Sequence, residues 1–152
     1  MGKFVSKTVA DRARHQQHIG FDGMTYGKCR PTDIDATMDW QGDTFVFIEV
    51  KTGKTNLTTG QQIYFRNVVD AIRAGGKAAY GIHVSHEVSD KADDVELATT
   101  EVIQYYDGLD AEGNVQKGAG WKRANPGTLL HDYLTELWHQ HTLRRKQMGK
   151  RV

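Results

Sequence analysis

Several features that would place this chain in a special class are missing from it. A single cysteine, Cys29, cannot form an internal disulfide, so a reducing compartment suits the chain. No apolar run approaches membrane-spanning length, and the first residues lack the apolar core of a secretory signal. There is no internal repeat and no low-complexity segment. We therefore expect a cytoplasmic protein, in a bacterium or in a phage-infected cell.

The chain also lacks an excess of charge of either sign. The 152 residues carry a formal net charge of +1, with 38% hydrophobic and 26% charged residues, which predicts one soluble globular domain over residues 1–152. A nucleic-acid surface would have to come from local clustering. One such cluster is the acid-free basic tail from about residue 144, which contains Arg144, Arg145 and Lys146. It suits either phosphate binding or a solvated, frayed terminus.

The most informative stretch is residues 45–51, where four apolar residues precede Glu49, Val50 and Lys51. Its β-branched and aromatic content predicts a buried strand. Because side chains alternate along a strand, Glu49 and Lys51 project from the same face. Charged groups are costly to bury unless they are paired or bound to something. A structural salt bridge between the two is the simplest interpretation.

A second group of acids lies upstream. Residues 34–40 read as another strand, and residues 41–43 as the tight turn of a hairpin joining it to 45–51. This pairing would bring Asp35, or Asp33, near Glu49. Carboxylates that close repel unless a hard cation such as Mg²⁺ lies between them. With Lys51 to orient water or stabilise charge on phosphate, the set suits metal-assisted phosphodiester hydrolysis.

Asp33 and Asp35 followed by Phe47-Ile48-Glu49-Val50-Lys51 resemble the PD-(D/E)XK nuclease superfamily, with its restriction-endonuclease-like fold. Residues 57–61, Leu-Thr-Thr-Gly-Gln, are similar to the helix start of the VRR-NUC and Holliday-junction-resolvase-like branches. The resemblance covers roughly residues 30–85. It implies an α/β fold, a three-layer core with a mixed central sheet flanked by helices.

The resemblance also implies roles for individual residues. Asp35 and Glu49 would hold Mg²⁺ or Mn²⁺, with Asp33 in reserve, Lys51 would position or activate water, and Gln61 would support the site. Asp35 is preferred to Asp33 because a small residue follows it, as glycine often follows the family's aspartate. Gln62 replaces Gln61 if the helix register slips by one residue.

The rest of the chain predicts an alternation of helices and strands. Helices are expected over residues 5–19, 61–74 and 126–145, strands over 78–84 (parallel to 45–51) and 100–106, and a loop over 107–120. Val102, Gln104 and Tyr106 should share one strand face. The first helix carries only Asp11 where the resolvase-like pattern has glutamate, which leaves its part in the site open. His83 and His86 lie where they could approach the site, although histidines at strand ends are more often structural.

These patterns favour a metal-dependent DNA endonuclease. Lys54, between the Glu-x-Lys strand and the next helix, and the basic tail are the candidate DNA contacts. By analogy, so small a chain leaves little room for a sequence-reading module, which favours structure-selective cleavage of branched or flapped DNA by a homodimer. The alternatives are a catalytically silent nuclease-fold module that binds DNA or protein, and a structural domain in which Glu49 and Lys51 form only a salt bridge.

Overall fold

The computed structural model describes residues 22–90 and 93–152. The chain divides into two compact units, Met1–Pro31 and Thr32–Val152. In the described part of the first unit, Tyr26 and Cys29 exchange two backbone hydrogen bonds of 3.0 Å, which close a turn. The helix predicted for residues 5–19, with Asp11, lies outside the described residues.

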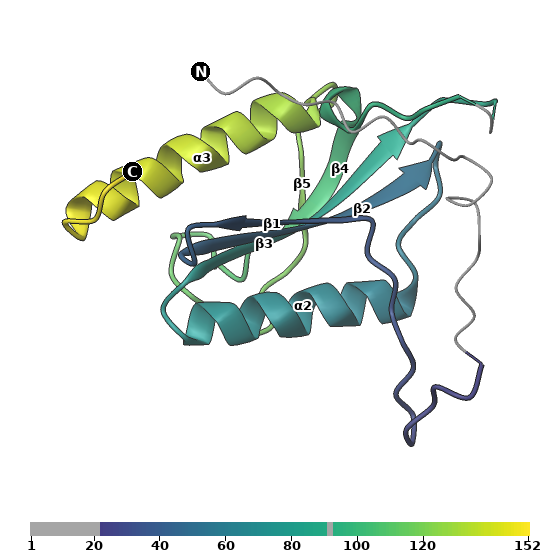
Figure 1. The fold of residues 1–152 in the computed structure, drawn as a ribbon, viewed down its shortest axis with the longest axis horizontal. Helices are drawn as coiled ribbons and strands as arrows, with labels where there is room; N and C mark the ends of the chain where they lie inside the picture. Colours follow the sequence, from purple (N-terminus) through teal and green to yellow (C-terminus); the bar gives the residue numbers. More distant parts are fainter. Residues whose placement is uncertain (1–21, 91–92) are drawn as a thin grey trace. The chain divides into compact units, whose positions relative to one another are not determined.

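The second unit is an α/β structure built on one mixed sheet (Figure 1). Its elements, in chain order, are β1 (Ala36–Trp40), β2 (Thr44–Thr52), α2 (Thr59–Ala74), β3 (Ala78–His86), the short 3₁₀ turn η1 (Leu97–Thr99), β4 (Glu101–Tyr106), β5 (Lys122–Arg123) and α3 (Leu130–Gln147). The strands lie side by side in the order β1-β2-β3-β4-β5. Only β2 and β3 are parallel, and the other neighbouring pairs are antiparallel.

Helices α2 and α3 lie on opposite faces of the sheet (Figure 1). Alternate residues of β2 and β3 therefore belong to different cores. The α3 side buries one cluster, made by Trp40, Val46, Ile48, Ala78, Tyr80, Ile82, Val84, Val102, Leu130 and Leu137. On the α2 side Val69, Ala79, Tyr106 and Ala119 form a second, smaller cluster. Glu49 and Lys51 alternate with Ile48 and Val50, so their side chains are on the α2 side.

The predicted hairpin and its parallel partner strand are confirmed. Trp40 and Asp43 close a turn whose central residues, Gln41 and Gly42, have φ values of 59° and 69°. Two positive φ angles match the right-handed twist of the flanking strands, and glycine adopts one of them without strain. The carboxylate of Asp39 accepts a hydrogen bond from the Gly42 amide at 2.7 Å and holds the turn.

Helix α2 confirms the helix predicted for residues 61–74, and it begins two residues earlier. Thr58 caps it, and the buried residues Gln61, Phe65 and Val69 recur at helical spacing. The helix passes very close to β3 at Gly81, where an added Cβ would lie 3.0 Å from Phe65 carbon atoms. Glycine at this position lets α2 approach the sheet, and so carries the start of α2 toward the end of β2.

Three details of the second half differ from the prediction. A register shift between His83 and Val84 pairs Val84 with Val102 but His83 with Gln104. Val102 therefore belongs to the α3-side cluster and Tyr106 to the α2-side cluster, so the expected common face for Val102, Gln104 and Tyr106 is wrong. A bulge of this kind breaks the period-2 alternation.

The other two differences lie nearer the C-terminus. Strand β5 is only two residues long and was not predicted. Helix α3 begins at Leu130 rather than at Pro126, because the preceding residues pair with the start of β4: Thr128 accepts from the Val102 amide at 2.8 Å, and the Leu130 amide donates to Thr100 at 2.9 Å. Within residues 22–90 and 93–152, no helix is both long and apolar enough to cross a membrane.

Candidate active site

The carboxylate of Glu49 is the centre of a polar cluster near the carboxyl end of β2. Its side chain is buried, with 5% of the residue exposed. Oε1 accepts a hydrogen bond from Nε2 of Gln61 at 2.5 Å and lies 2.9 Å from Nζ of Lys51. The predicted Glu49–Lys51 contact therefore exists, and the same oxygen is also held by α2.

Gln61 reaches Glu49 because of the way α2 begins. Thr58 and Gln61 form a capping box. The Thr58 hydroxyl accepts from the backbone amide of Gln61, and Gln61 Oε1 accepts from the backbone amide of Thr58 at 3.1 Å. With Oε1 engaged, the Gln61 side chain presents its Nε2 donor to Glu49. Gln62, the alternative in the sequence, donates to the Leu57 carbonyl at 3.2 Å and does not contact Glu49 in this way.

Asp35 lies against β2 beside Glu49. The last ladder pair of β1 and β2 is Ala36 with Ile48, so Asp35 comes one position beyond it, opposite Glu49. There its Oδ2 accepts a hydrogen bond from the Val50 amide at 2.7 Å, in place of a strand partner. Asp33 and Asp35 are both exposed, and Asp33 lies two residues further from the strand. The structure thus holds Lys51 and Gln61 against Glu49, and it holds Asp35 on the backbone of the next residue, Val50.

The two oxygens of Glu49 differ in their surroundings. Oε2 is buried and has no hydrogen-bond partner, unlike Oε1. An unpartnered buried carboxylate oxygen fits a hard cation, since Mg²⁺ is usually held by one or two carboxylates plus water and phosphate oxygens. No group of three or more His, Cys, Asp or Glu side chains that could hold a metal occurs among the described residues. The protein would therefore supply two carboxylates, Asp35 and Glu49, and no larger cage.

His83 of β3 lies next to Glu49 of β2 across the sheet, and the two residues form a row on the α2 side. It pairs in register with Glu49 from the neighbouring parallel strand, is 1% exposed, and has its Nδ1 3.2 Å from Nε2 of Gln104. Burial lowers the pKa of His83, and Lys51 acts in the same direction, while the Thr55 backbone opposes the shift. The ring is therefore neutral near pH 7. Its Nε2 is buried without a hydrogen-bond partner.

Sequence reasoning placed His83 near the site but did not select it. A polar residue inside the apolar run of β3 was the available signal, since His83 stands among residues that are nearly all buried. Pairing it with Glu49 needs the register of two parallel strands, which alternation alone does not fix. His86 is not part of this row: its Nε2 lies 3.2 Å from the Thr52 hydroxyl and its Nδ1 accepts from the Val88 amide.

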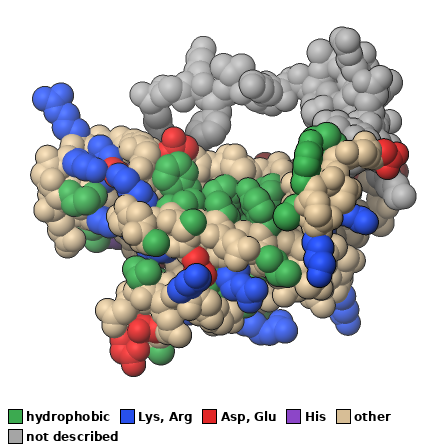
Figure 2. Space-filling model, turned by 90° about the horizontal axis from the view of Figure 1, so that it is seen from below, with side chains coloured by type: hydrophobic (Ala, Val, Ile, Leu, Met, Phe, Trp, Pro, Cys, Tyr) green, Lys and Arg blue, Asp and Glu red, His purple; other side chains and the backbone are tan. Residues whose placement is uncertain are grey.

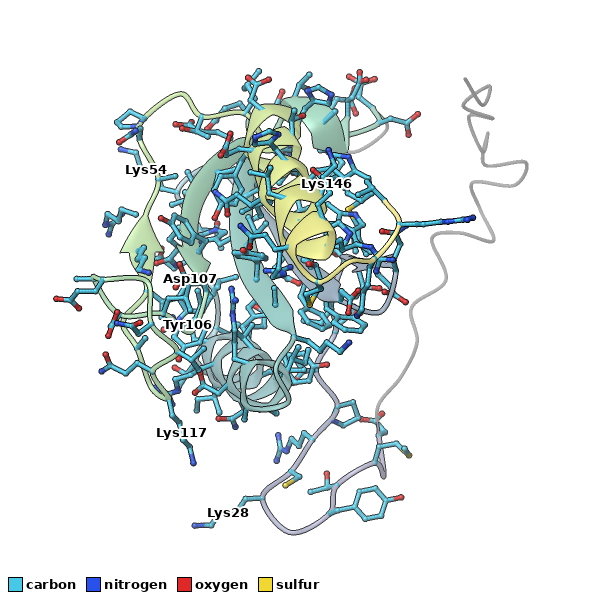
Figure 3. All side chains as sticks on the ribbon, turned by 90° about the vertical axis from the view of Figure 1, so that its left-hand side faces the viewer. Lys28, Lys54, Tyr106, Asp107, Lys117 and Lys146 are labelled. Carbon is cyan, nitrogen blue, oxygen red and sulfur yellow. The ribbon has the colours of Figure 1, made fainter. Side chains whose placement is uncertain are left out.

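The candidate DNA contacts lie at two different ends of β2. Lys54 is exposed on the loop that follows β2, and Lys146 is exposed on the last turn of α3 (Figure 3). Arg144 and Arg145 are less free than the sequence suggested. They donate to the Thr44 hydroxyl and to the Asp43 carboxylate at the start of β2. Seen from the α2 side, the lysine and arginine side chains of the described chain occur in several separate groups (Figure 2).

Asp43 is the acid that organises the start of β2. It is 3% exposed and contacts Lys77 at 2.6 Å, Lys150 at 2.9 Å and Arg145. Hydrogen bonds from Lys77 and Lys150 hold the pKa of Asp43 well below its usual range. Two basic side chains near the end of α3, Arg145 and Lys150, thus pair with an internal acid.

Comparisons with known proteins leave the assignment to chemistry. No protein-family model matches the chain, and neither the curated proteins nor the solved structures contain a match.

Proposed function

We propose that this chain is a Mg²⁺- or Mn²⁺-dependent DNA endonuclease of the PD-(D/E)XK type, with a restriction-endonuclease-like core. The proposal is supported by the groups that lie at one end of the mixed sheet. These are Asp35 before β1, Glu49 and Lys51 at the end of β2, and Gln61 at the start of α2. A parallel pair of strands bracketing α2, with a helix on each face of the sheet, is compatible with that core.

Each residue has a role that its contacts allow. Asp35 and Glu49 Oε2 would hold the cation, which would supply Lewis-acid activation of the phosphodiester. Lys51, held against Glu49 Oε1 and 18% exposed at its side chain, can present its ammonium to a phosphate oxygen or to the attacking water. Gln61 fixes the carboxylate plane of Glu49, so that the unpartnered oxygen keeps one direction.

The observation that carries the proposal is the asymmetry of Glu49. A purely structural salt bridge would satisfy the carboxylate, because a buried charged oxygen without a partner is costly. Here the side-chain amide of Gln61 and the Lys51 ammonium are both directed to Oε1, and Oε2 is left buried and unpartnered, one residue along β2 from the Val50 amide that Asp35 accepts from. Such a cost is typical of sites that bind something.

Nicking of supercoiled plasmid tests the proposal. The wild type should nick in Mg²⁺ or Mn²⁺ and stop when EDTA is added, and Lys51→Ala should nick at least 100-fold more slowly while its circular-dichroism spectrum is unchanged. Lys54→Ala, on the loop three residues after Lys51, serves as the control and should affect DNA binding more than rate. A wild type that never nicks, or a folded Lys51→Ala variant with full activity, would contradict the proposal.

The same preparation distinguishes a second candidate, a catalytically silent nuclease-fold module that binds DNA or protein. The 2.9 Å contact between Lys51 and Glu49 favours it, because an ammonium held by a carboxylate can serve structure alone. A silent module would bind DNA in a gel-shift assay and leave plasmid intact at every metal concentration. For a wild type that cuts, a panel of linear, single-stranded, flapped and four-way DNA would show whether branched substrates are preferred.

A further inference from the structure

Two buried side-chain atoms lack a hydrogen-bond partner within residues 22–90 and 93–152, namely Glu49 Oε2 and His83 Nε2. Their residues are 5% and 1% exposed. They are register partners on the adjacent parallel strands β2 and β3, and both side chains are on the α2 side of the sheet. Two unmet polar atoms as neighbours on one sheet face point to something that satisfies both.

The hydrogen bonds around His83 fix what its free nitrogen can offer. The Gln104 amide nitrogen, 3.2 Å from Nδ1, can only donate, so Nδ1 is the acceptor. In a neutral imidazole the proton is then on Nε2. The Thr55 backbone lies close enough to the ring to raise the pKa of His83, against the larger effect of burial. It makes no hydrogen bond of acceptable geometry with Nε2. The pair therefore offers one N–H donor, from His83, and one carboxylate acceptor, from Glu49.

We infer that His83 Nε2–H and Glu49 Oε2 together bind a water molecule in the active site. Water can accept from the imidazole and donate to the carboxylate at the same time. A phosphate oxygen can only accept, and it would be repelled by Glu49. A carboxylate oxygen has two lone-pair directions, so Glu49 Oε2 can face this water and a cation together.

This inference rests on the proposed function, and it adds His83 to the site as a positioning residue. The water would sit on the same carboxylate that Lys51 and Gln61 hold. Its orientation would then be set from β3, through a ring that Gln104 of β4 keeps in place. Misplacing such a water should slow the chemical step and leave DNA affinity unchanged.

Two substitutions separate this role from a structural one. His83→Gln keeps an N–H donor near the Nε2 position, whereas His83→Asn keeps a polar atom only near Nδ1, where Gln104 binds. We expect single-turnover cleavage to fall about 100-fold in His83→Asn and less than 10-fold in His83→Gln, with equal DNA affinity. His86→Asn, on the same strand but outside the row, should cut normally. A His83→Asn variant as fast as wild type, or an order of rates reversed between the two variants, would overturn the inference.

Nuclear magnetic resonance of the unliganded wild type gives a reading that does not depend on activity. The His83 ring should be the Nε2–H tautomer, with a cross-peak between Hε2 and a long-lived water, and Glu49→Gln should shift the Nε2 signal of His83 but not that of His86. An Nδ1–H tautomer, or no water cross-peak, would overturn the water site. A wild type that cuts no DNA would instead overturn the proposed function and the water's catalytic role, while the cross-peak would still decide whether the pair binds water.

Discussion

At the scale of single residues, the side chain of Gln61 links the helix cap at Thr58 to the carboxylate of Glu49. Gln61 accepts from the Thr58 amide and donates to Glu49, so one side chain both begins α2 and orients the acid. The sequence predicted Gln61 as a supporting residue of the site through the resemblance of residues 57–61 to a helix start. It could not predict the capping box as the device that directs Nε2 to Glu49, since that depends on the torsion of the amide.

Gln61→Ala should therefore lower turnover by about 100-fold, with a smaller change in DNA affinity, because Glu49 loses its fixed direction. It should also lower stability by about 1 kcal/mol, the usual scale for a lost helix cap. Single-turnover rates, binding constants and chemical unfolding measure these effects. Gln62→Ala is the matched control, because the Gln62 side chain donates to the Leu57 carbonyl and not to Glu49. Equal rates for the wild type and Gln61→Ala would remove Gln61 from the site.

A second buried histidine has a purely structural setting. His141 is 1% exposed, stacks on Trp138 and contacts the Trp40 ring. Gln41 Oε1 can only accept, so His141 Nε2 donates to it at 3.0 Å. Burial lowers the pKa of His141, so the ring is neutral near pH 7 and its Nδ1 accepts from the Thr44 hydroxyl, 2.9 Å away.

The stability of the protein should fall between about pH 7 and pH 5. Burial lowers the pKa of His141 below its ordinary 6.5, and Arg144 and Arg145 act in the same direction against a weaker opposing effect of Asp43. The unfolded chain thus binds a proton that the folded chain resists, and stability is lost as the pH falls through the unfolded value. Each such group contributes at most about 1.4 kcal/mol per pH unit.

Unfolding by denaturant at several pH values measures this slope. His83 has a lowered pKa for the same first reason, burial, so the wild type should show the combined effect of the two rings. His141→Gln should flatten the slope in this window, and His139→Gln, an exposed neighbour on α3, should leave it as in the wild type. An unchanged slope in His141→Gln would mean that this ring titrates normally in the folded state.

At the scale of secondary-structure elements, β2 joins a cluster that stabilises the fold to the candidate active site. Its start, at Asp43 and Thr44, fastens the end of α3, and its end carries Glu49 and Lys51. The internal acid Asp43 takes up Arg145, Lys77 and Lys150. The basic tail is thus a tie between α3 and β2 as well as a candidate DNA contact.

Arg145 and Lys146 should consequently behave differently when replaced by alanine. Arg145→Ala should lower the melting temperature, because it removes a partner from a buried carboxylate, and should leave the salt dependence of DNA binding nearly unchanged. Lys146→Ala should keep the melting temperature and flatten the log–log salt slope by about 0.9 if its ammonium meets one phosphate. Fluorescence anisotropy over a salt series and thermal melts would measure both. Two variants with identical salt slopes and melting temperatures would contradict this division.

Local chemistry predicted most of the elements. The Gln41-Gly42 turn, the end of α2 at Gly75-Gly76 and the strand character of β2 and β3 each follow from residues close in sequence. Long-range pairing decided the rest. The shift beside His83 and the two-residue β5 depend on β4 meeting its neighbours, and the late start of α3 depends on Thr128 pairing with β4. None of these has a local sequence signal of its own.

At the scale of the whole molecule, a net charge of +1 gives no general attraction for DNA, so the proposed function depends on the local arrangement of charged residues. The sequence predicted which acids could share a site, and it preferred Asp35 to Asp33 only through the family resemblance. The structure adds one difference: Asp35, at the end of the β1–β2 ladder, accepts a hydrogen bond from the Val50 amide, while both aspartates are exposed. Alternation cannot separate two residues that differ by two positions.

That Asp35 and Glu49 jointly hold a divalent cation is tested most directly by thermal melts of the wild type and Asp35→Asn over a Mn²⁺ series. Mass action adds about 2.7 kcal/mol at 100 times the dissociation constant, which for a chain of this size raises the melting temperature by about 5–10 °C. Asp35→Asn keeps an oxygen for the Val50 amide but removes one of two repelling charges. It should therefore melt at or above the wild type without metal and respond far less to Mn²⁺, while Asp33→Asn should respond like the wild type. Melting temperatures that Mn²⁺ does not move, or that it raises equally in Asp35→Asn and the wild type, would contradict the metal site.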